Sequence, residues 1–568
     1  MFMVTSLLVG STLLSQLADG RPIVDSLTAQ DSNSNPLALG ELSSGAILPV
    51  GSRDISEATH RALLDTAAGE NDCASSQNFP PGFVHRNGTN FVLDNQLFHV
   101  VGANQYYLML TALTDWKAVE SVLDEAQSLG LNVLRTWAFA ERQDGDPPTK
   151  PALTLQPGVY DESTFRALDR VIAAASTRGL RLLLALGNHW DAFGGAPQYV
   201  SWSRQYGDAS EVNGSAAGVD HFYSSPWCRD AYRQFVTALV GRVNSVTGVP
   251  YKEDPSIFGF DLLNEPRVES DASGDVLHRF LDEQSRFLKS LDPWHMITTG
   301  AEGYYGASTP HLVANNPGGT ATSGNDFVRN HLLPAIDFAT IHVWPDQWLS
   351  CCTAKCLKPF LATWLDSHVD AANGLIGKPL LVEEFGAKLR CTPSPPPPSS
   401  TAKSPPPPSP PVPPPPAPSP SPPPPPPFPP QPAPVAAVHH GGGVHHRGSP
   451  QAAAHGQAIS TVKAVSGPPP PMMVHGVNVT ASPSPPLLRD EMYRLVYSSR
   501  AKKHTVFWIL GAQGLPDGDG YTLYSQLDPT TVKVIAKHVE AIRQLTAVAP
   551  SSDANSSDSD TSTTKDAA

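Results

Sequence analysis

The sequence is poor in positive charge. Its 568 residues contain 39 lysines and arginines against 53 acidic residues, so the formal net charge is −14 at pH 7. Nucleic acids and anionic membrane surfaces both bind cationic faces, which argues against either as the main partner. The charge balance suits a neutral ligand better.

Several patterns that mark other classes of protein are missing. Glycine does not recur with a period of three, which excludes collagen. The one apolar run, residues 2–17, is too short to cross a bilayer, so no stable membrane insertion is expected. No Gly-x-Ser-x-Gly motif supports an esterase, and no glycine-rich loop supports a nucleotide-binding sheet. The six cysteines lack the spacing of a zinc site, so we expect no metal and interpret the cysteines as disulfides, with some remaining as free thiols as the alternative.

The two ends of the chain have the composition of processed or unfolded segments. Residues 1–20 are predicted to be a signal peptide, because an apolar stretch precedes a small-residue cleavage site. An ordinary hydrophobic N-terminus is the alternative. Residues 21–75 and 550–568 are small and polar, and we expect both to be disordered. Sequons at Asn87, Asn213, Asn478 and Asn555 fit a secreted, extracellular glycoprotein.

Proline, by contrast, is abundant and unevenly distributed. The chain has 59 prolines, and 35 of them lie between Cys391 and Leu487. Proline lacks a backbone N–H and fixes φ, so residues 392–486 are predicted to form an extended, disordered insert. We expect this insert to be a glycosylated spacer or an attachment to the cell wall or matrix. A tolerated loop insertion without function is the alternative.

Short apolar strands alternate with amphipathic helices in the rest of the chain. An Asn87-Gly88 turn first joins two short strands into a hairpin. The strands predicted after it are residues 98–107, 131–139, 180–187, 257–265, 296–303, 337–344, 379–386 and 504–514. This alternation favours an α/β fold of the (β/α)8 TIM-barrel type over an open doubly wound sheet. The barrel is expected to occupy residues 76–391 and 487–549, with the insert after the seventh strand.

Two glutamates stand at the ends of predicted barrel strands, where such barrels carry their active sites. Glu265 closes the fourth strand, beside Asn264, and Glu384 closes the seventh. One carboxyl group held protonated and one held ionised can divide the two roles of glycoside hydrolysis. The alternative is that each glutamate pairs with a nearby cation and only caps a helix. Alternation along the seventh strand sends Glu383 and Glu384 to opposite sides, so only one should face the barrel axis.

Other residues at the same strand ends suit a sugar-binding cleft. Arg135 ends the second strand, and its guanidinium can keep a carboxylate ionised and oriented. His342 and Trp344 end the sixth strand, and Trp508 ends the eighth. Aromatic faces stack on the C–H faces of pyranose rings, while polar neighbours bind hydroxyl groups. Plain core packing is the alternative for any one tryptophan.

The ordered set of motifs resembles a known family. Asn264-Glu265-Pro266 after one strand and Glu384-Phe385-Gly386 after a later one resemble glycoside hydrolase family 5. Within that family, further segments resemble the endo-β-1,4-mannanases of plants and fungi: 102–107 (GANQYY), 134–137 (LRTW), 188–191 (NHWD), 302–306 (EGYYG) and 342–346 (HVWPD). The resemblance covers residues 79–547 apart from the insert.

The resemblance implies roles for the residues at the strand ends. It implies Glu265 as the general acid/base and Glu384 as the nucleophile. The substrate-binding residues that it implies are Arg135, Trp137, Asn188, Asn264, Glu302, His342, Trp344 and Trp508. Among them, Asn264 would bind the 2-hydroxyl group of the sugar and Arg135 would orient the nucleophile.

The resemblance also implies a reaction and a substrate class. It implies a secreted retaining hydrolase that needs no metal, nucleotide or organic cofactor. Its expected partners are β-mannan-type polysaccharides, which it would cut at internal β-1,4 bonds of mannan, glucomannan or galactomannan. A β-1,4-glucanase on the same fold is one alternative, and a matrix glycoprotein whose barrel only binds polysaccharide is another.

Overall fold

The computed structural model describes residues 79–207, 218–319, 323–349, 354–388, 488–512, 515 and 519–548. The predicted signal peptide, leader, proline-rich insert and C-terminal tail lie outside these residues. None of the described helices is long and apolar enough to cross a membrane.

Eight parallel strands form the central sheet, in the order β10-β9-β8-β5-β4-β13-β12-β11. Their bounds are β4 (Val101–Asn104), β5 (Val133–Trp137), β8 (Arg181–Ala185), β9 (Ile257–Asp261), β10 (Met296–Thr298), β11 (Ala339–Val343), β12 (Leu380–Phe385) and β13 (Thr505–Phe507). Backbone hydrogen bonds join the two outer strands, since Asp337 N donates to Ile297 O at 2.8 Å and His342 N donates to Glu302 O at 3.0 Å. The sheet is thereby closed, and the prediction of a (β/α)8 barrel is confirmed.

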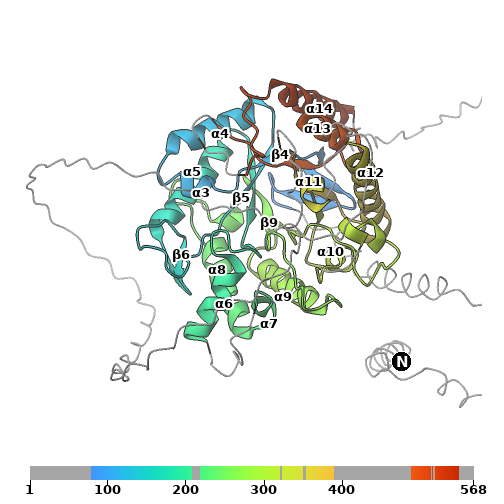
Figure 1. The fold of residues 1–568 in the computed structure, drawn as a ribbon. Helices are drawn as coiled ribbons and strands as arrows, with labels where there is room; N and C mark the ends of the chain where they lie inside the picture. The colour runs from blue at the N-terminus through green and yellow to red at the C-terminus, as the bar shows by residue number, and fades with distance from the viewer. Residues whose placement is uncertain are drawn as a thin grey trace, which may run out of the picture. The chain divides into compact units, whose positions relative to one another are not determined.

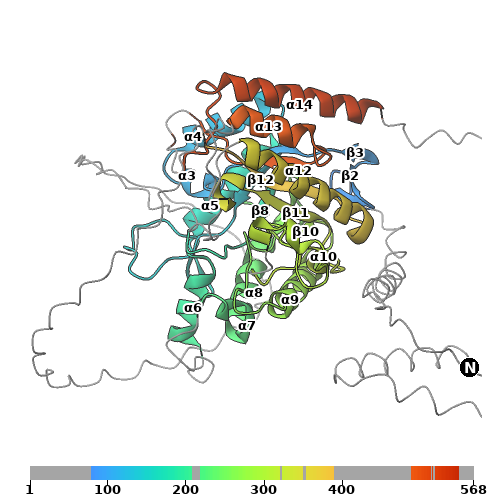
Figure 2. The same ribbon diagram turned by 45° about the vertical axis from the view of Figure 1, so that its right-hand side comes forward.

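Helices surround the strands, as Figures 1 and 2 show. They are α3 (Leu108–Thr111), α4 (Trp116–Ser128), α5 (Glu162–Ser176), α6 (Gly195–Tyr206), α7 (His221–Ser224), α8 (Pro226–Val240), α9 (Asp275–Leu291), α10 (Phe327–His331), α11 (Pro345–Trp348), α12 (Ala354–Ala371), α13 (Arg489–Ser498) and α14 (Pro529–Val548). α4 illustrates why they form. Asp115 caps its N-terminus by accepting from Ala118 N at 3.0 Å, and Val119, Val122 and Ala126 bury one face at helical spacing.

A three-stranded antiparallel sheet precedes the barrel and covers one end of it (Figure 2). Its strands are β1 (Val84–Asn87), β2 (Asn90–Leu93) and β3 (Gln96–Phe98), so the predicted Asn87-Gly88 hairpin is present. Phe91 packs edge-to-face on Phe258 and Phe338, with ring centroids 5.4 Å away in each case. This contact seals the end of the barrel opposite the carboxyl ends of its strands.

The first barrel strand begins later than the predicted residue 98. Phe98 pairs with Phe91 in the antiparallel sheet, and the barrel strand begins at Val101. The reason is a second tight turn at Asp94 and Asn95, whose φ angles are 49° and 64°. Two consecutive residues with positive φ form the kind of hairpin turn that returns the chain immediately.

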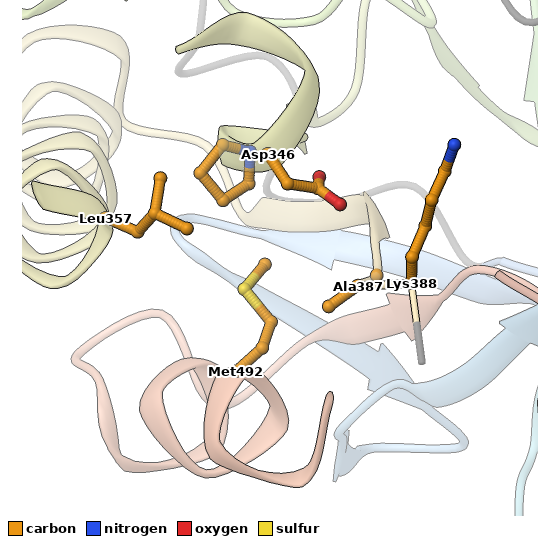
Figure 3. A pocket seen from close by; sticks show the side chains of 7 residues that line it. Asp346, Leu357, Ala387, Lys388 and Met492 are labelled. Atoms are coloured by element: carbon orange, nitrogen blue, oxygen red, sulfur yellow. The ribbon is translucent and has the colours of Figure 1, made fainter. Parts of the chain in front are cut away.

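Hydrogen bonds join the chain on either side of the segment 389–487. Arg489 is 5% exposed, and its Nε donates to the carbonyl of Ala387 at 2.9 Å. Its other guanidinium nitrogens donate to the carbonyls of Thr522 and Gly520, at 3.0 Å each. A cavity of about 10 Å³ at this junction is no larger than one water needs, and Figure 3 shows the side chains around it. The end of β12 and the start of α13 are therefore packed directly together.

The cysteines differ in their pairing. Cys356 is disulfide-bonded, as the sequence predicts. Cys228 instead keeps a buried thiol on α8, and its Sγ lies 3.6 Å from the carbonyl oxygen of Tyr199. The remaining four cysteines lie outside the described residues.

Candidate active site

The residues expected at the site lie at the carboxyl ends of the barrel strands. Arg135 and Trp137 are on β5, His342 is on β11 and Glu384 is on β12. The other candidates lie within a few residues after the end of a strand. Asn188 follows β8, Asn264 and Glu265 follow β9, Glu302 follows β10, Trp344 follows β11 and Trp508 follows β13. The barrel thus brings segments from most of the chain to one face, which is the face where such barrels carry their sites.

Arg135 is the fully buried centre of this cluster. Its NH1 lies 2.5 Å from Glu384 Oε1, and its NH2 lies 2.5 Å from Asp261 Oδ2. NH2 also donates to Asn264 Oδ1 at 2.8 Å. Burial disfavours the charge, but Glu383, Asp261 and Glu384 outweigh it and raise the pKa of Arg135. The guanidinium is therefore a permanent cation that orients the carboxyl group of Glu384.

Asp261 is a residue that the sequence reasoning missed. It ends β9, is fully buried, and receives two hydrogen bonds from Arg135. A charged residue closing an apolar strand was the available signal. Its contacts fix Arg135 from the side opposite Glu384.

His342 lies between carboxylates on both edges of its ring. Nδ1 is 2.8 Å from Glu265 Oε1 and 3.4 Å from Glu384 Oε2, and Nε2 is 3.3 Å from Glu383 Oε2. Burial opposes a charge on the ring, but the surrounding glutamates raise the pKa of His342 well above its ordinary value. Only the imidazolium form can donate from both nitrogens, so the ring is held as a cation.

The expectation that only one of the two strand-seven glutamates faces the axis is wrong. Glu383 and Glu384 both contact Arg135 and His342. The cause is an irregularity in the pairing of β11 with β12, where Ile341 is opposite Val382 but His342 is opposite Glu384. Glu383 is the extra residue of this bulge, and a bulge breaks the alternation of side chains.

Glu265 is held in an uncommon backbone conformation. Its φ is 51°, and its N–H donates to Gly300 O at 2.8 Å. Such a conformation costs free energy in a residue with a side chain, and it occurs preferentially at functional sites. Trp190 Nε1 donates to Glu265 Oε2 at 2.6 Å, so both carboxyl oxygens have defined partners.

Asn188 and Glu302 contact residues that lie next to the reacting carboxyl groups rather than those groups themselves. Both are fully buried. Asn188 Oδ1 accepts from Asn264 Nδ2 at 3.0 Å, and Glu302 Oε1 accepts from Arg267 Nε at 2.9 Å. The guanidinium of Arg267 in turn lies over the ring of Trp190. The structure therefore places these two residues as supports for Asn264, Arg267 and Trp190.

Three tryptophans line the same region, and two of them share Tyr106 as a partner. Trp344 Nε1 lies 3.3 Å from Glu384 Oε2. Trp508 donates from Nε1 to Asp519 Oδ2 at 2.8 Å and stacks on Tyr106, with ring centroids 5.3 Å apart. Trp137 packs against the same Tyr106. The sequence reasoning missed Tyr106 and Asp519 as the partners that fix Trp508.

The carboxyl groups of Glu265 and Glu384 lie close together, and their pKa values differ widely. One oxygen of each and a ring nitrogen of His342 all lie within 4.8 Å of one another. Burial raises the pKa of Glu384 to about 7, against the attraction of His342 and Arg135. Burial acts in the same direction on Glu265, but the hydrogen bond and charge of His342 lower its pKa to about 2. The pair of carboxyl groups therefore binds its first proton and its second proton at widely separated pH values.

The same trio is the one place among the described residues where side chains converge as metal ligands do. A metal ion needs a lone pair on the imidazole nitrogen. The Nδ1 of His342 faces two carboxylates and carries a proton in the imidazolium form. In that form Nδ1 has no lone pair to offer a metal ion.

Comparisons with known proteins point to one family. A family model described as glycoside hydrolase family 5 β-mannosidase-like matches residues 81–392. Mannan endo-1,4-beta-mannosidase 1 of Oryza sativa subsp. japonica is 41% identical over 308 residues, which cover 54% of this chain and 68% of that protein. Mannan endo-1,4-beta-mannosidase 2 of Arabidopsis thaliana is 42% identical over 307 residues, with the same two shares.

Solved structures show the same fold. The endo-1,4-beta-D-mannanase of Thermotoga petrophila RKU-1 matches with a TM-score of 0.53 and 24% identity, covering 78% of this chain and 100% of that one. The endo-1,4-beta-mannanase of Rhizomucor miehei matches with a TM-score of 0.54 and 22% identity, covering 81% and 99%.

Proposed function

The chain belongs to the β-mannosidase-like group of glycoside hydrolase family 5, and on this premise we propose that it is a retaining endo-β-1,4-mannanase. Its substrates are mannan, glucomannan or galactomannan. The observation that carries the proposal is the short distance between Glu265 and Glu384, which place carboxyl oxygens within 4.8 Å of each other. Retaining glycosidases hold their two carboxyl groups about 5–5.5 Å apart, whereas inverting enzymes leave about 6.5–9.5 Å for a water.

The reaction proceeds in two displacements. The Glu384 carboxylate attacks the anomeric carbon, the glycosidic bond breaks, and the leaving oxygen takes a proton from Glu265. Glu265 then removes a proton from water, whose oxygen attacks the same carbon and releases Glu384. Two inversions give a product with the original β configuration.

Neighbouring residues prepare each participant for its step. Arg135 and Trp344 contact the two oxygens of Glu384 and orient it toward the sugar. Asn264, held by Arg135 and Asn188, offers its amide to the sugar 2-hydroxyl group. The ring of Trp508 supplies a stacking face, and no resident cofactor takes part in either step.

His342 links the acid/base to the nucleophile. Its Nδ1 lies 2.8 Å from Glu265 and 3.4 Å from Glu384. The Nδ1 proton can therefore pass to Glu265, and the lone pair that it frees on Nδ1 can then accept the proton of Glu384, with no change in the total charge. This transfer gives the reactive arrangement, in which Glu265 is protonated and Glu384 is ionised.

The pH profile of kcat/KM is expected to be bell-shaped. The active form carries one proton on the Glu265–Glu384 pair, which is lost as the pH rises through about 7. A second proton is added only as the pH falls toward about 2. Initial rates on a soluble manno-oligosaccharide should therefore be highest in the acidic range and decline above neutrality. Activity that increases from pH 7 to 9 would contradict this assignment.

Substrate and stereochemistry are tested together. The purified full-length chain is incubated with mannan, glucomannan, galactomannan and cellulose, and reducing-sugar release is measured. We expect release from the three mannans, with short oligosaccharides as products and the β anomer formed first in the NMR spectrum. Release from cellulose alone would indicate a β-1,4-glucanase, binding to mannan without release would indicate a matrix glycoprotein, and the α anomer would exclude retention.

We further propose that the enzyme is secreted and that residues 392–486 attach it to the wall or matrix. Their proline-rich composition supports this proposal. Because Arg489 joins the chain directly to Ala387, replacing residues 394–484 by a short Gly/Ser loop should change neither the melting temperature nor turnover on soluble oligosaccharides. Retention on isolated cell walls should decrease. Unchanged retention would refute the attachment, and a large drop in melting temperature would show that the segment supports the barrel.

A further inference from the structure

We propose that Glu383 is a positioning residue of the active site, which holds the His342 imidazolium and the Arg135 guanidinium against the reacting pair. This inference rests on the proposed function and deepens it. Nothing in the sequence motifs assigns a role to this glutamate, because the resemblance selects Glu384 as the nucleophile and alternation would then direct Glu383 away from the axis.

The geometry places Glu383 behind both cations. Its Oε2 lies 3.3 Å from His342 Nε2, and its Oε1 lies 3.6 Å from Arg135 Nε. Its side chain is fully buried, and its backbone carbonyl accepts from Asn104 Nδ2 at 2.9 Å. The bulge in β12 therefore delivers a second carboxylate to a site that already contains Glu384.

A purely structural residue at this position would not need a charge. Burying a carboxylate is costly, and a whole buried ion pair can often be replaced by apolar side chains of similar volume with equal or better stability. The partners of the Glu383 carboxylate are both cations, Arg135 and His342, and this explains why a charge is needed. By accepting from Nε2, it favours the imidazolium form of His342, whose other proton then points from Nδ1 toward Glu265 and Glu384.

The charge of Glu383 also acts on the proton balance of the whole cluster. The charged groups that face it are Arg135 on β5, Asp261 on β9, His342 on β11 and Glu384 on β12, with Glu265 beyond His342. Burial raises the pKa of Asp261 to about 7, and the charge of Glu383 adds to this effect. Burial likewise raises the pKa of Glu384, and Glu383 contributes there too.

Removing the negative charge of Glu383 should lower the pKa values of the neighbouring groups. A nearby negative charge makes every neighbouring group hold its proton more tightly. Without it, the proton on the Glu265–Glu384 pair is lost at lower pH. Both limbs of the pH profile should therefore move in the acidic direction, whereas a loss of packing would lower the rate without moving the limbs.

The test compares two variants of Glu383 and one control variant, all in the full chain. Glu383→Gln is expected to lower kcat on soluble manno-oligosaccharides by about 10²-fold, the scale of an about 1 Å displacement of catalytic groups. Its alkaline limb should move down by about one pH unit, the lower end of a neighbouring-charge effect. Glu383→Asp keeps the charge, so its limbs should stay in place while its rate decreases. KM should change little in either variant, because Glu383 does not touch the substrate.

Glu141 supplies the matched control. It is also a buried glutamate, 3% exposed, and its Oε2 accepts from Gly195 N at 2.9 Å. Burial raises the pKa of Glu141 to about 8, so below that pH Glu141→Gln replaces a buried carboxyl group outside the cluster without removing a charge, and it should leave both limbs in place. Limbs that stay fixed in Glu383→Gln, or that move equally in Glu141→Gln, would overturn the inference.

A second measurement does not depend on the substrate. The ring nitrogens of His342 are followed by ¹⁵N NMR, with the signal assigned by its loss in His342→Gln. We expect an imidazolium at pH 7 in the wild type and in Glu383→Asp, and partial conversion to the neutral ring in Glu383→Gln. An identical titration in all three would refute the role of Glu383 even if mannan proved not to be the substrate. If the titration shifts as expected but no mannan is cleaved, the proposed function alone fails.

Discussion

Replacing Glu384 by glutamine should reduce kcat on mannan by about 10⁴-fold or more, the scale of losing a catalytic group that acts as part of a unit. An amide has nearly the same shape as the carboxylate but cannot form the covalent bond to the anomeric carbon. The protein should remain folded, because the glutamine oxygen can still accept from Arg135, and Arg135 keeps its contact with Asp261. Turnover measured beside a thermal melt tests both statements.

Glu265→Gln separates the two carboxyl groups by their chemistry. The substrate for this test is an aryl β-mannobioside whose phenol is acidic enough to leave without protonation. Glu265→Gln should therefore still release a burst of phenol, and turnover should then stop at the glycosyl-enzyme. Glu384→Gln should release none, because its first step cannot occur. A burst from Glu384→Gln and none from Glu265→Gln would mean that the roles are exchanged.

The fold could be predicted from the sequence because its signals are local. Each of the eight parallel strands lies inside a predicted apolar run. The error at Phe98 has the opposite origin. Asp94 and Asn95 form a turn whose effect depends on pairing between β2 and β3, and a run of apolar residues does not show where one sheet ends and another begins.

The site was predictable only as far as it follows the strand ends. Glu265, Glu384, Arg135 and His342 were identified because polar residues there end apolar strands. The prediction for Glu383 is wrong because the bulge arises from the register between β11 and β12, which are separated in the chain by α11 and α12. Alternation within one strand cannot reveal such a shift.

Arg135 is the residue on which the folded site depends most. It is fully buried and contacts Asp261, Glu383 and Glu384, while His342 is the other cation beside these carboxylates. Removing one partner of a buried ion pair leaves an uncompensated charge, which costs far more than the net contribution of the intact pair. A substitution at this position should therefore affect stability as well as turnover.

Arg135→Met is expected to lower the free energy of unfolding by about 3–5 kcal/mol at pH 8, the usual cost of an uncompensated buried charge. The deficit should shrink at pH 5. Without the guanidinium the pKa of Asp261 and of Glu384 rises further above the unfolded values, so protonation stabilises the folded variant as the pH falls. Urea unfolding at the two pH values measures the free energy of unfolding of the variant and of the wild type.

The same substitution at Arg178, which pairs with the exposed Asp124 at 2.6 Å, should cost no more than about 1 kcal/mol. Equal losses at both positions, or a deficit at Arg135 that does not change with pH, would show that the guanidinium does not neutralise the buried carboxylates.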